Sequence, residues 1–204
     1  MSSALSYIHR QRLVHLDVKP ANVIVTESDR CKLTDFGCSQ RLPSVDDAVR
    51  SPTQRRPGSP TLNGTFAYRA PELLRGGAAT PAADVYSLGV TLWQLRSRST
   101  PYAGRDWHAV IFAVVAYHDR PDTSPALRRR RSAAVCRPPP PAVADVGPRT
   151  PDRRYRSVFR SCWNASADAR PTAAELVRLF RTWRTELDDV CSTSSFDADD
   201  VNDI

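Results

Sequence analysis

The sequence predicts a mainly helical domain that also contains short β-hairpins. Apolar residues recur at helical spacing through the second half of the chain, and two short β-rich stretches joined by polar residues lie near its start. The length of 204 residues permits one domain with a sizeable core and does not require two. We expect this domain over residues 1–187 and an acidic, disordered tail over residues 188–204.

The β-rich stretches are Val23 to Thr26 and Cys31 to Thr34, and the polar residues 27–30 join them. Two such runs separated by a short polar turn predict a hairpin. Asn22 comes directly before the first run and Asp35 directly after the second. The hairpin is therefore expected to bring Asn22 and Asp35 toward each other.

Residues 84–95 are apolar nearly all round, which predicts a helix buried inside the domain. Asp84 begins this stretch and is of a type that often caps a helix. Three further helices follow from apolar residues at helical spacing. The last of them begins with a capping box of Thr172 and Glu175. The three faces expected to be buried consist of Trp107, Val110, Ile111, Val114 and Val115; of Tyr155, Val158, Phe159, Cys162 and Trp163; and of Leu176, Leu179, Phe180, Trp183 and Leu187.

One stretch combines the residue types that phosphoryl transfer requires. Residues 15–22 read His-Leu-Asp-Val-Lys-Pro-Ala-Asn, and residues 35–37 read Asp-Phe-Gly. This reaction is catalysed mainly by holding phosphate oxyanions, a metal ion and the acceptor hydroxyl in line. A lone Asp-Phe-Gly could arise by chance, but the eight-residue block at this spacing argues against a coincidence.

These motifs resemble the catalytic motifs of protein kinases that act on Ser and Thr. The resemblance implies that Asp17 orients the acceptor hydroxyl or acts as a base, and that Lys19 neutralises the transferring phosphate. It also implies that Asn22 and Asp35 bind Mg²⁺ together with ATP. The activation segment would run from Asp35 to Glu72, because residues 64–72 resemble its end.

The same resemblance assigns supporting residues. Thr65 would lie near the catalytic aspartate and help to position the substrate, and Asp84 would accept hydrogen bonds from the backbone of the catalytic loop. Glu72 would form an ion pair with Arg170. A buried pair costs about 3 to 5 kcal/mol when one partner is removed, whereas a surface pair is worth about 0 to 1 kcal/mol. The matching flanking motifs favour the buried pair.

A closer resemblance is to the Mos family of Ser/Thr kinases, and it covers roughly residues 4–120 and 155–187. It rests on residues 15–17, 35–39, 69–74, 91–94 and 113–117. It implies a cytoplasmic germ-cell kinase that phosphorylates MAP kinase kinase during oocyte meiotic maturation. Residues 118–154 depart from the family pattern and are expected to be a disordered or aberrant insertion.

Leu16 stands where most regulated kinases have an arginine that pairs with a phosphorylated residue of the activation loop. A leucine cannot make this pair, although it can pack beneath the loop. We therefore expect that phosphorylation is not an on-switch acting through the catalytic loop. The candidate positions are Ser51, Thr53, Ser59 and Thr61.

A complete kinase also needs a Gly-rich phosphate loop, a strand lysine paired with a helix glutamate, and a hinge for adenine. No Gly-rich loop precedes Asp17 in this sequence. We therefore expect the C-terminal lobe of a kinase with the N-lobe absent, which by itself binds ATP poorly and transfers little or no phosphate. The alternative function is an interaction or competitor fragment that binds kinase partners without catalysis.

The formal charge of +7 is unevenly distributed, since residues 128–154 are rich in arginine and the end of the chain is acidic. The basic stretch with its prolines 138–141 predicts an extended insertion, with a nuclear-import signal, an SH3-type ligand or a dock for acidic partners as alternatives. The five cysteines form an odd set without paired metal spacing, as in reduced intracellular proteins. No signal peptide or membrane span is predicted, and we expect a monomer without a specific nucleic-acid partner.

Overall fold

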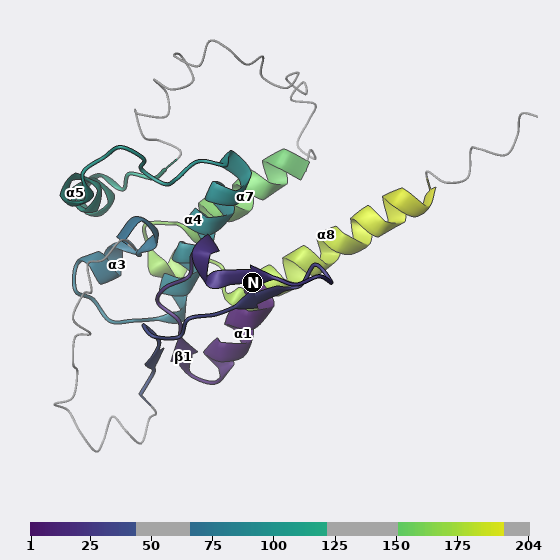
Figure 1. Ribbon diagram of the computed structural model, residues 1–204, viewed down its shortest axis with the longest axis horizontal. Coiled ribbons are helices and arrows are strands. Elements are labelled where there is room, and N and C mark those ends of the chain that lie inside the picture. The colour runs from purple at the N-terminus through teal and green to yellow at the C-terminus, as the bar shows by residue number, and fades with distance from the viewer. Residues whose placement is uncertain (44–65, 122–150, 194–204) are drawn as a thin grey trace, which may run out of the picture.

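The computed structural model describes residues 1–43, 66–121 and 151–193, and it confirms a mainly helical fold with few short strands (Figure 1). The helices are α1 (Ser2–Arg10), α3 (Pro71–Leu74), α4 (Pro81–Ser97), α5 (Trp107–Tyr117), α7 (Pro151–Cys162) and α8 (Ala173–Thr193). Short 3₁₀ turns are formed by Pro20–Asn22, Phe66–Tyr68 and Ala167–Ala169. In these parts of the chain, no helix is long and apolar enough to cross a membrane.

Two antiparallel strand pairs organise residues 13–41, one inside this stretch and one at its ends. Strands β2 (Val23–Val25) and β3 (Cys31–Leu33) pair with Val23 opposite Leu33, which confirms the predicted hairpin. Strands β1 (Leu13–Val14) and β4 (Gln40–Arg41) also pair, with Leu13 opposite Arg41. This second pair was not predicted, because two-residue strands leave almost no pattern in a sequence.

Helix α4 runs through the interior, as its apolar sequence predicts, and every residue from Ala83 to Thr91 is buried. Asp84 is the fourth residue of this helix, and Thr80 occupies the N-cap position. The interpretation of Asp84 as an N-cap is therefore wrong. Helix α7 packs closely on α4 at Gly89, where a Cβ atom would lie 2.8 Å from the Cβ of Cys162.

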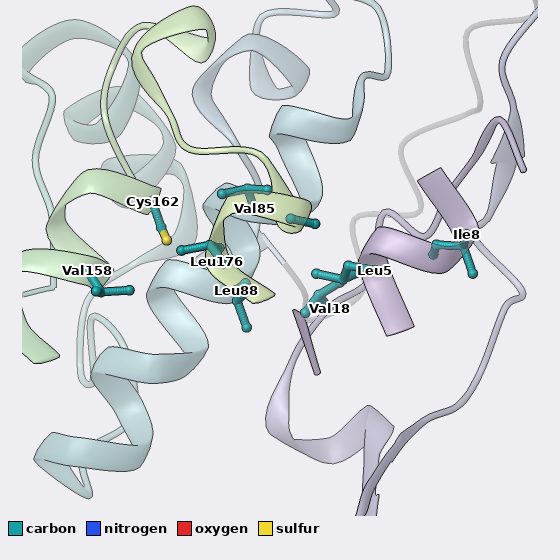
Figure 2. Close-up of a cluster of buried hydrophobic side chains, with 9 residues drawn as sticks. Leu5, Ile8, Val18, Val85, Leu88, Val158, Cys162 and Leu176 are labelled. Carbon is teal, nitrogen blue, oxygen red and sulfur yellow. The ribbon is translucent and has the colours of Figure 1, made fainter. Parts of the chain in front are cut away.

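The largest buried cluster joins four helices and the loop before β2 (Figure 2). Its labelled members are Leu5 and Ile8 of α1, Val18 of the loop, Val85 and Leu88 of α4, Val158 and Cys162 of α7, and Leu176 of α8. The predicted core face of α7 is confirmed, with only Tyr155 partly exposed. The loop that carries Asp17 and Asn22 is thus anchored directly in the core through Val18.

The predicted face of α5 is only partly buried. Val110 and Val114 lie in a small cluster with Tyr102, whereas Trp107, Ile111 and Val115 are half-buried. Ala113 is also buried, although the stripe read from the sequence did not include it. The helix therefore turns a slightly different face to the core than its spacing predicts.

The capping box of α8 is present, because Glu175 accepts a hydrogen bond of 2.7 Å from the Thr172 amide and donates its own amide to Thr172 Oγ1 at 3.2 Å. The prediction of a fully buried stripe is wrong, since Leu179 is 36% and Leu187 58% exposed. Leu187 lies in the half of α8 whose end extends away from the other helices in Figure 1, although Glu186 beside it still pairs with Arg154 of α7.

Two predicted boundaries also change. Helix α8 continues to Thr193, so residues 188–193 are helical and do not belong to a disordered tail. Helix α7 begins at Pro151, so the last four residues of the predicted insertion, 151–154, are part of the fold. The basic stretch with its prolines and the remaining acidic residues 194–204 lie outside the described residues.

Candidate active site

Asp17 and Asn22 lie together in the loop between β1 and β2, and they are only 7% and 6% exposed. Asn22 Nδ2 donates to the backbone oxygen and to the Oδ2 of Asp17, both at 2.9 Å. Lys19 Nζ lies 2.8 Å from the same Oδ2. One carboxylate oxygen of Asp17 is therefore held by two donors, of which one is charged.

The other carboxylate oxygen, Asp17 Oδ1, is buried and has no hydrogen-bond partner among the described residues. Leaving a buried acceptor unsatisfied costs about 1 to 3 kcal/mol, and more for a charged group. Such a cost is typical of a functional site at which a ligand supplies the missing donor. The free oxygen is suited to accept a hydrogen bond from a substrate hydroxyl.

Asp35 is brought to this loop by the β2–β3 hairpin. Thr34 donates its amide and its hydroxyl to the backbone oxygen of Asn22, at 2.9 and 3.1 Å. Asp35 follows in a left-handed conformation with φ of 60°, and its carboxylate is exposed and accepts a hydrogen bond from the Gly37 amide. The contact between Thr34 and the backbone oxygen of Asn22 thus brings the next residue, Asp35, toward Asn22.

The donor set of Asn22 and Asp35 fits a magnesium ion bound with a nucleotide. Amide and carboxylate oxygens are hard ligands, and Mg²⁺ is usually held by one or two protein groups together with phosphates and water. The described residues contain no group of three or more His, Cys, Asp or Glu side chains that could hold a metal alone. The site therefore provides part of a coordination shell that phosphate oxygens would complete.

His15 links the loop to the hairpin, although it was not predicted as a site residue. Its ring is fully buried, its Nδ1 accepts the Asp17 amide at 3.3 Å, and its Nε2 lies 3.0 Å from the backbone oxygen of Thr34. Because Nδ1 accepts, the proton is on Nε2 and is donated to Thr34. The ring also contacts Phe36 edge-on, with centroids 4.8 Å apart. The sequence signal that could have identified His15 is its place in the motif, two residues before Asp17.

Asp84 makes the backbone contacts expected from the resemblance. Its two carboxylate oxygens accept the amides of His15 and Leu16 at 2.8 and 2.7 Å. Leu16 has a left-handed φ of 64°, which is unfavourable for a residue with a side chain. These two hydrogen bonds hold the loop in that conformation directly before Asp17.

Glu72 and Arg170 form the expected ion pair, in its buried form. Arg170 Nη1 and Nη2 contact the two carboxylate oxygens at 2.6 and 2.8 Å, and the Arg170 side chain is 0% exposed. The guanidinium also lies over the Tyr86 ring, 5.0 Å from its centroid. Burial raises the pKa of Tyr86, and the charges of Arg120 and Arg170 oppose this shift.

Thr65 lies outside the described residues, as do the candidate phosphorylation positions Ser51, Thr53, Ser59 and Thr61. Sequence reasoning also missed an apolar surface beside the metal-binding candidates. Ile24, Val25 and Phe36 are 55%, 64% and 45% exposed. The β-branched Ile24 and Val25 predicted a strand and Phe36 was interpreted as part of the Asp-Phe-Gly motif, and nothing in the local pattern indicated that these side chains face outward.

A model of the protein kinase domain matches residues 1–179. The chain belongs to the protein kinase family. Asp17, Asn22 and Asp35 all lie within the matched residues.

Among curated kinases, the serine/threonine-protein kinase mos of Patiria pectinifera is 46% identical over 175 residues, which cover 85% of this chain and 42% of that protein. The serine/threonine-protein kinase mos of Xenopus laevis is 39% identical over 180 residues, covering 87% of this chain and 44% of the relative. The proto-oncogene serine/threonine-protein kinase mos of Sus scrofa is 38% identical over 185 residues, covering 91% and 46%. The chain spans less than half the length of these relatives.

Proposed function

We propose that the chain is the helical, C-terminal lobe of a Ser/Thr protein kinase of the Mos type, and that the protein containing it transfers the γ-phosphate of ATP to hydroxyl groups of protein substrates. The observation that carries this proposal is that Asp17 Oδ1 has no hydrogen-bond partner within residues 1–43, 66–121 and 151–193. Its neighbour Oδ2 is occupied by Lys19 and Asn22. A buried carboxylate with one fixed and one free oxygen is prepared to orient a hydroxyl for attack.

The other residues divide the remaining work. Lys19 is 23% exposed at its side chain, so its ammonium group can contact both Asp17 and a phosphate oxygen. Asn22 and Asp35 would hold Mg²⁺, and ATP would supply the phosphoryl group. Thr65 would help to position the substrate hydroxyl. Ile24 offers an exposed apolar surface next to this site, on which a nucleotide base can lie.

The similarity to Mos kinases supports a finer proposal. The substrate is MAP kinase kinase, and the protein acts as a cytoplasmic monomer in oocyte meiotic maturation. These assignments depend on the relatives, because the described side chains carry no information on the substrate sequence. The substrate assignment is tested by using MAP kinase kinase as the acceptor.

A second candidate function is binding to kinase partners without catalysis. It is favoured by the outer face of α5, where Phe112 and Tyr117 are 61% and 72% exposed and contact each other edge-on. A groove of about 620 Å³ lies beside them, lined also by Arg105 and Asp119. Exposed apolar surfaces of this kind commonly bind proteins. A docking module would still bind its partner through this surface after a substitution at one of the proposed metal ligands.

The deciding experiment measures phosphate transfer from ATP to MAP kinase kinase in the presence of Mg²⁺. It uses the 204-residue chain and the longest natural protein that contains it. We expect Asp17→Asn and Asp35→Asn to lower kcat by about 100-fold or more. Asp29→Asn, in the exposed turn of the hairpin, is the matched control and should retain activity. Full activity of Asp17→Asn would refute the proposal. An inactive wild type whose Asp35→Asn variant still binds the partner would favour the docking module.

A further inference from the structure

Helix α5 combines an apolar sequence with an exposed side. Its 11 residues include no Asp, Glu, Lys or Arg, and a helix that is apolar nearly all round is normally buried all round. Only one side of α5 is buried, through Val110, Ala113 and Val114. Helices α7 and α8 differ, because their exposed positions carry charged residues. The apolar residues on the exposed side of α5, here called the α5 face, are Ala109, Phe112, Ala116 and Tyr117.

The α5 face is shaped to receive a protruding side chain. The Phe112 and Tyr117 rings are 61% and 72% exposed and contact each other edge-on, with centroids 5.5 Å apart. A groove of about 620 Å³ lies beside them, with Ala109 and Ala113 among its lining residues. Exposed aromatic rings beside a groove are typical of the anchor points of protein interfaces. The α5 face therefore fits an aliphatic or aromatic side chain of a partner.

The charges around the groove are paired within the chain. Its two formally charged lining residues, Arg105 and Asp119, form an ion pair with each other. Asp106, at the N-cap of α5, accepts the amides of His108 and Ala109 at 2.9 and 3.2 Å. The groove thus offers no excess of either charge, although the chain carries a formal charge of +7. Complementarity requires an apolar, uncharged patch on the partner and excludes a strongly acidic or basic segment.

The α5 face belongs to a helix that packs on the residues after Thr65. Phe66 packs against the buried side of α5, and its ring centroid lies 6.1 Å from that of Trp107. Arg75 Nη2 donates to the backbone oxygen of Val115 at 2.8 Å, and α3 lies next to α5 in Figure 1. Under the proposed function, Thr65 helps to position the substrate hydroxyl. A protein seated on the α5 face is held beside this segment, which a substrate requires and an unrelated partner does not.

We propose that the α5 face is a docking site for the protein substrate of the kinase. The substrate binds through an apolar, uncharged patch and places one aliphatic or aromatic side chain in the groove. This inference rests on the proposed function. Contacts on the α5 face hold the substrate while its acceptor segment reaches Asp17, so they contribute binding energy away from the reacting groups. The face therefore lowers the KM for a folded protein, and a short peptide with only the acceptor residue gains nothing from it.

Three substitutions test the α5 face and its chemistry. Phe112→Ser removes an exposed ring, and Ala109→Glu adds a charge to the groove while leaving both rings in place. Both positions are exposed, so the fold should persist, and an unchanged thermal unfolding midpoint checks this. Tyr7→Ser is the matched control, because it removes a ring that is 59% exposed on α1, which lies away from α5 in Figure 1.

Binding to the 204-residue chain gives the first readout, with MAP kinase kinase as the probe in isothermal titration calorimetry. We expect Phe112→Ser and Ala109→Glu each to weaken binding about tenfold or more, and Tyr7→Ser to stay within about twofold of the wild type. Raising NaCl from about 0.05 to about 0.3 M should change the affinity by less than about threefold, since the contact is uncharged. Equal binding by all variants, a steep salt dependence or no binding by the wild type would each overturn the inference.

Sedimentation of the chain without a partner tests a second copy as the occupant. We expect a monomer, because the proposed occupant is the substrate. A dimer that Phe112→Ser dissociates would show that a second copy covers the α5 face, and it would overturn the inference.

Phosphate transfer gives the last readout. In an active protein, Phe112→Ser should raise the KM for MAP kinase kinase about tenfold and keep kcat near its wild-type value. With a short peptide that carries the same acceptor residue, the variant and the wild type should have the same kcat/KM. A variant that is equally impaired with the peptide would contradict docking. If the wild type phosphorylates neither acceptor, the proposed function fails, and the binding experiment still decides whether the α5 face holds this partner.

Discussion

Arg170 and Glu72 lie 98 residues apart in the sequence and meet in a two-armed ion pair that joins α3 to the turn before α8. The guanidinium is fully buried, and it donates further hydrogen bonds to the backbone oxygens of Ala82 and Asn164. The pair therefore ties α3 to the core of the helical domain. The Arg170 side chain is 0% exposed, so water does not solvate its charge in the folded chain.

Glu72→Gln should destabilise the chain by about 3 to 5 kcal/mol, because it leaves a buried, uncompensated charge. Urea denaturation followed by circular dichroism measures this change. The matched control is Glu186→Gln, which breaks the exposed pair between Glu186 and Arg154 and should cost about 0 to 1 kcal/mol. Similar small losses for both variants would mean that the Glu72 pair contributes no more than a surface pair.

Gly89→Ala should destabilise the chain by about 1 to 3 kcal/mol through overpacking. The added Cβ would lie 2.8 Å from the Cβ of Cys162 and 3.0 Å from the backbone oxygen of Phe159, so α4 and α7 would have to move apart. Leu95→Ala, at an exposed position of the same helix, should change the stability by less than about 0.5 kcal/mol. Thermal unfolding compares the two, and a Gly89→Ala variant as stable as the wild type would contradict the close packing.

The capping box of α8 should make stability depend on pH. The backbone amide of Thr172, and then its hydroxyl, lower the pKa of Glu175. Because the folded-state pKa lies below the unfolded one, this carboxylate stabilises the fold above its unfolded pKa, and the contribution is lost as pH falls through the folded pKa. Glu175→Gln should therefore lower the urea midpoint at pH 7, and the difference should shrink as the pH falls below about 4. Thr172→Ser keeps both donors and should show the wild-type pH dependence.

Alanine at Ser51, Thr53, Ser59 and Thr61 should leave phosphate transfer within a factor of about two of the wild type, since Leu16 has no charge to pair with a phosphate. In the structure, the Leu16 side chain is half-buried and packs against the cluster of Tyr86, Trp93 and Phe159. A steady-state assay of the quadruple variant tests this expectation. Loss of activity that acidic residues at the same positions restore would show that a phospho-switch operates after all.

The features that the sequence predicted correctly depend mostly on near neighbours in the chain. The β2–β3 hairpin and the cap at Thr172 and Glu175 each involve residues within about a dozen positions, so turn chemistry and capping rules are sufficient. The buried face of α7 followed from periodicity alone. The Glu72–Arg170 pair was accessible only through the resemblance to kinases.

The features that the sequence did not predict depend on which elements meet in space. His9 and Asp84 are 75 residues apart, and no local pattern indicates that the His9 ring lies within hydrogen-bond distance of the Asp84 carboxylate. Leu187 has the right spacing for a buried stripe, but it is 58% exposed, in the half of α8 whose end extends away from the other helices. The lack of a partner for Asp17 Oδ1 among the residues that the structure describes likewise appears only once their donors are placed around the carboxylate.

The ladder between Leu13–Val14 and Gln40–Arg41 closes the stretch that contains Asp17, Asn22 and Asp35 into a ring. The three side chains therefore lie in one closed loop. The conformational entropy that the chain loses on closing this loop grows only slowly with the length of the loop. A substitution that opened this ladder would loosen all three side chains together, although it touched none of them. Conversely, a residue inserted in the exposed hairpin turn would lengthen the ring without reopening it.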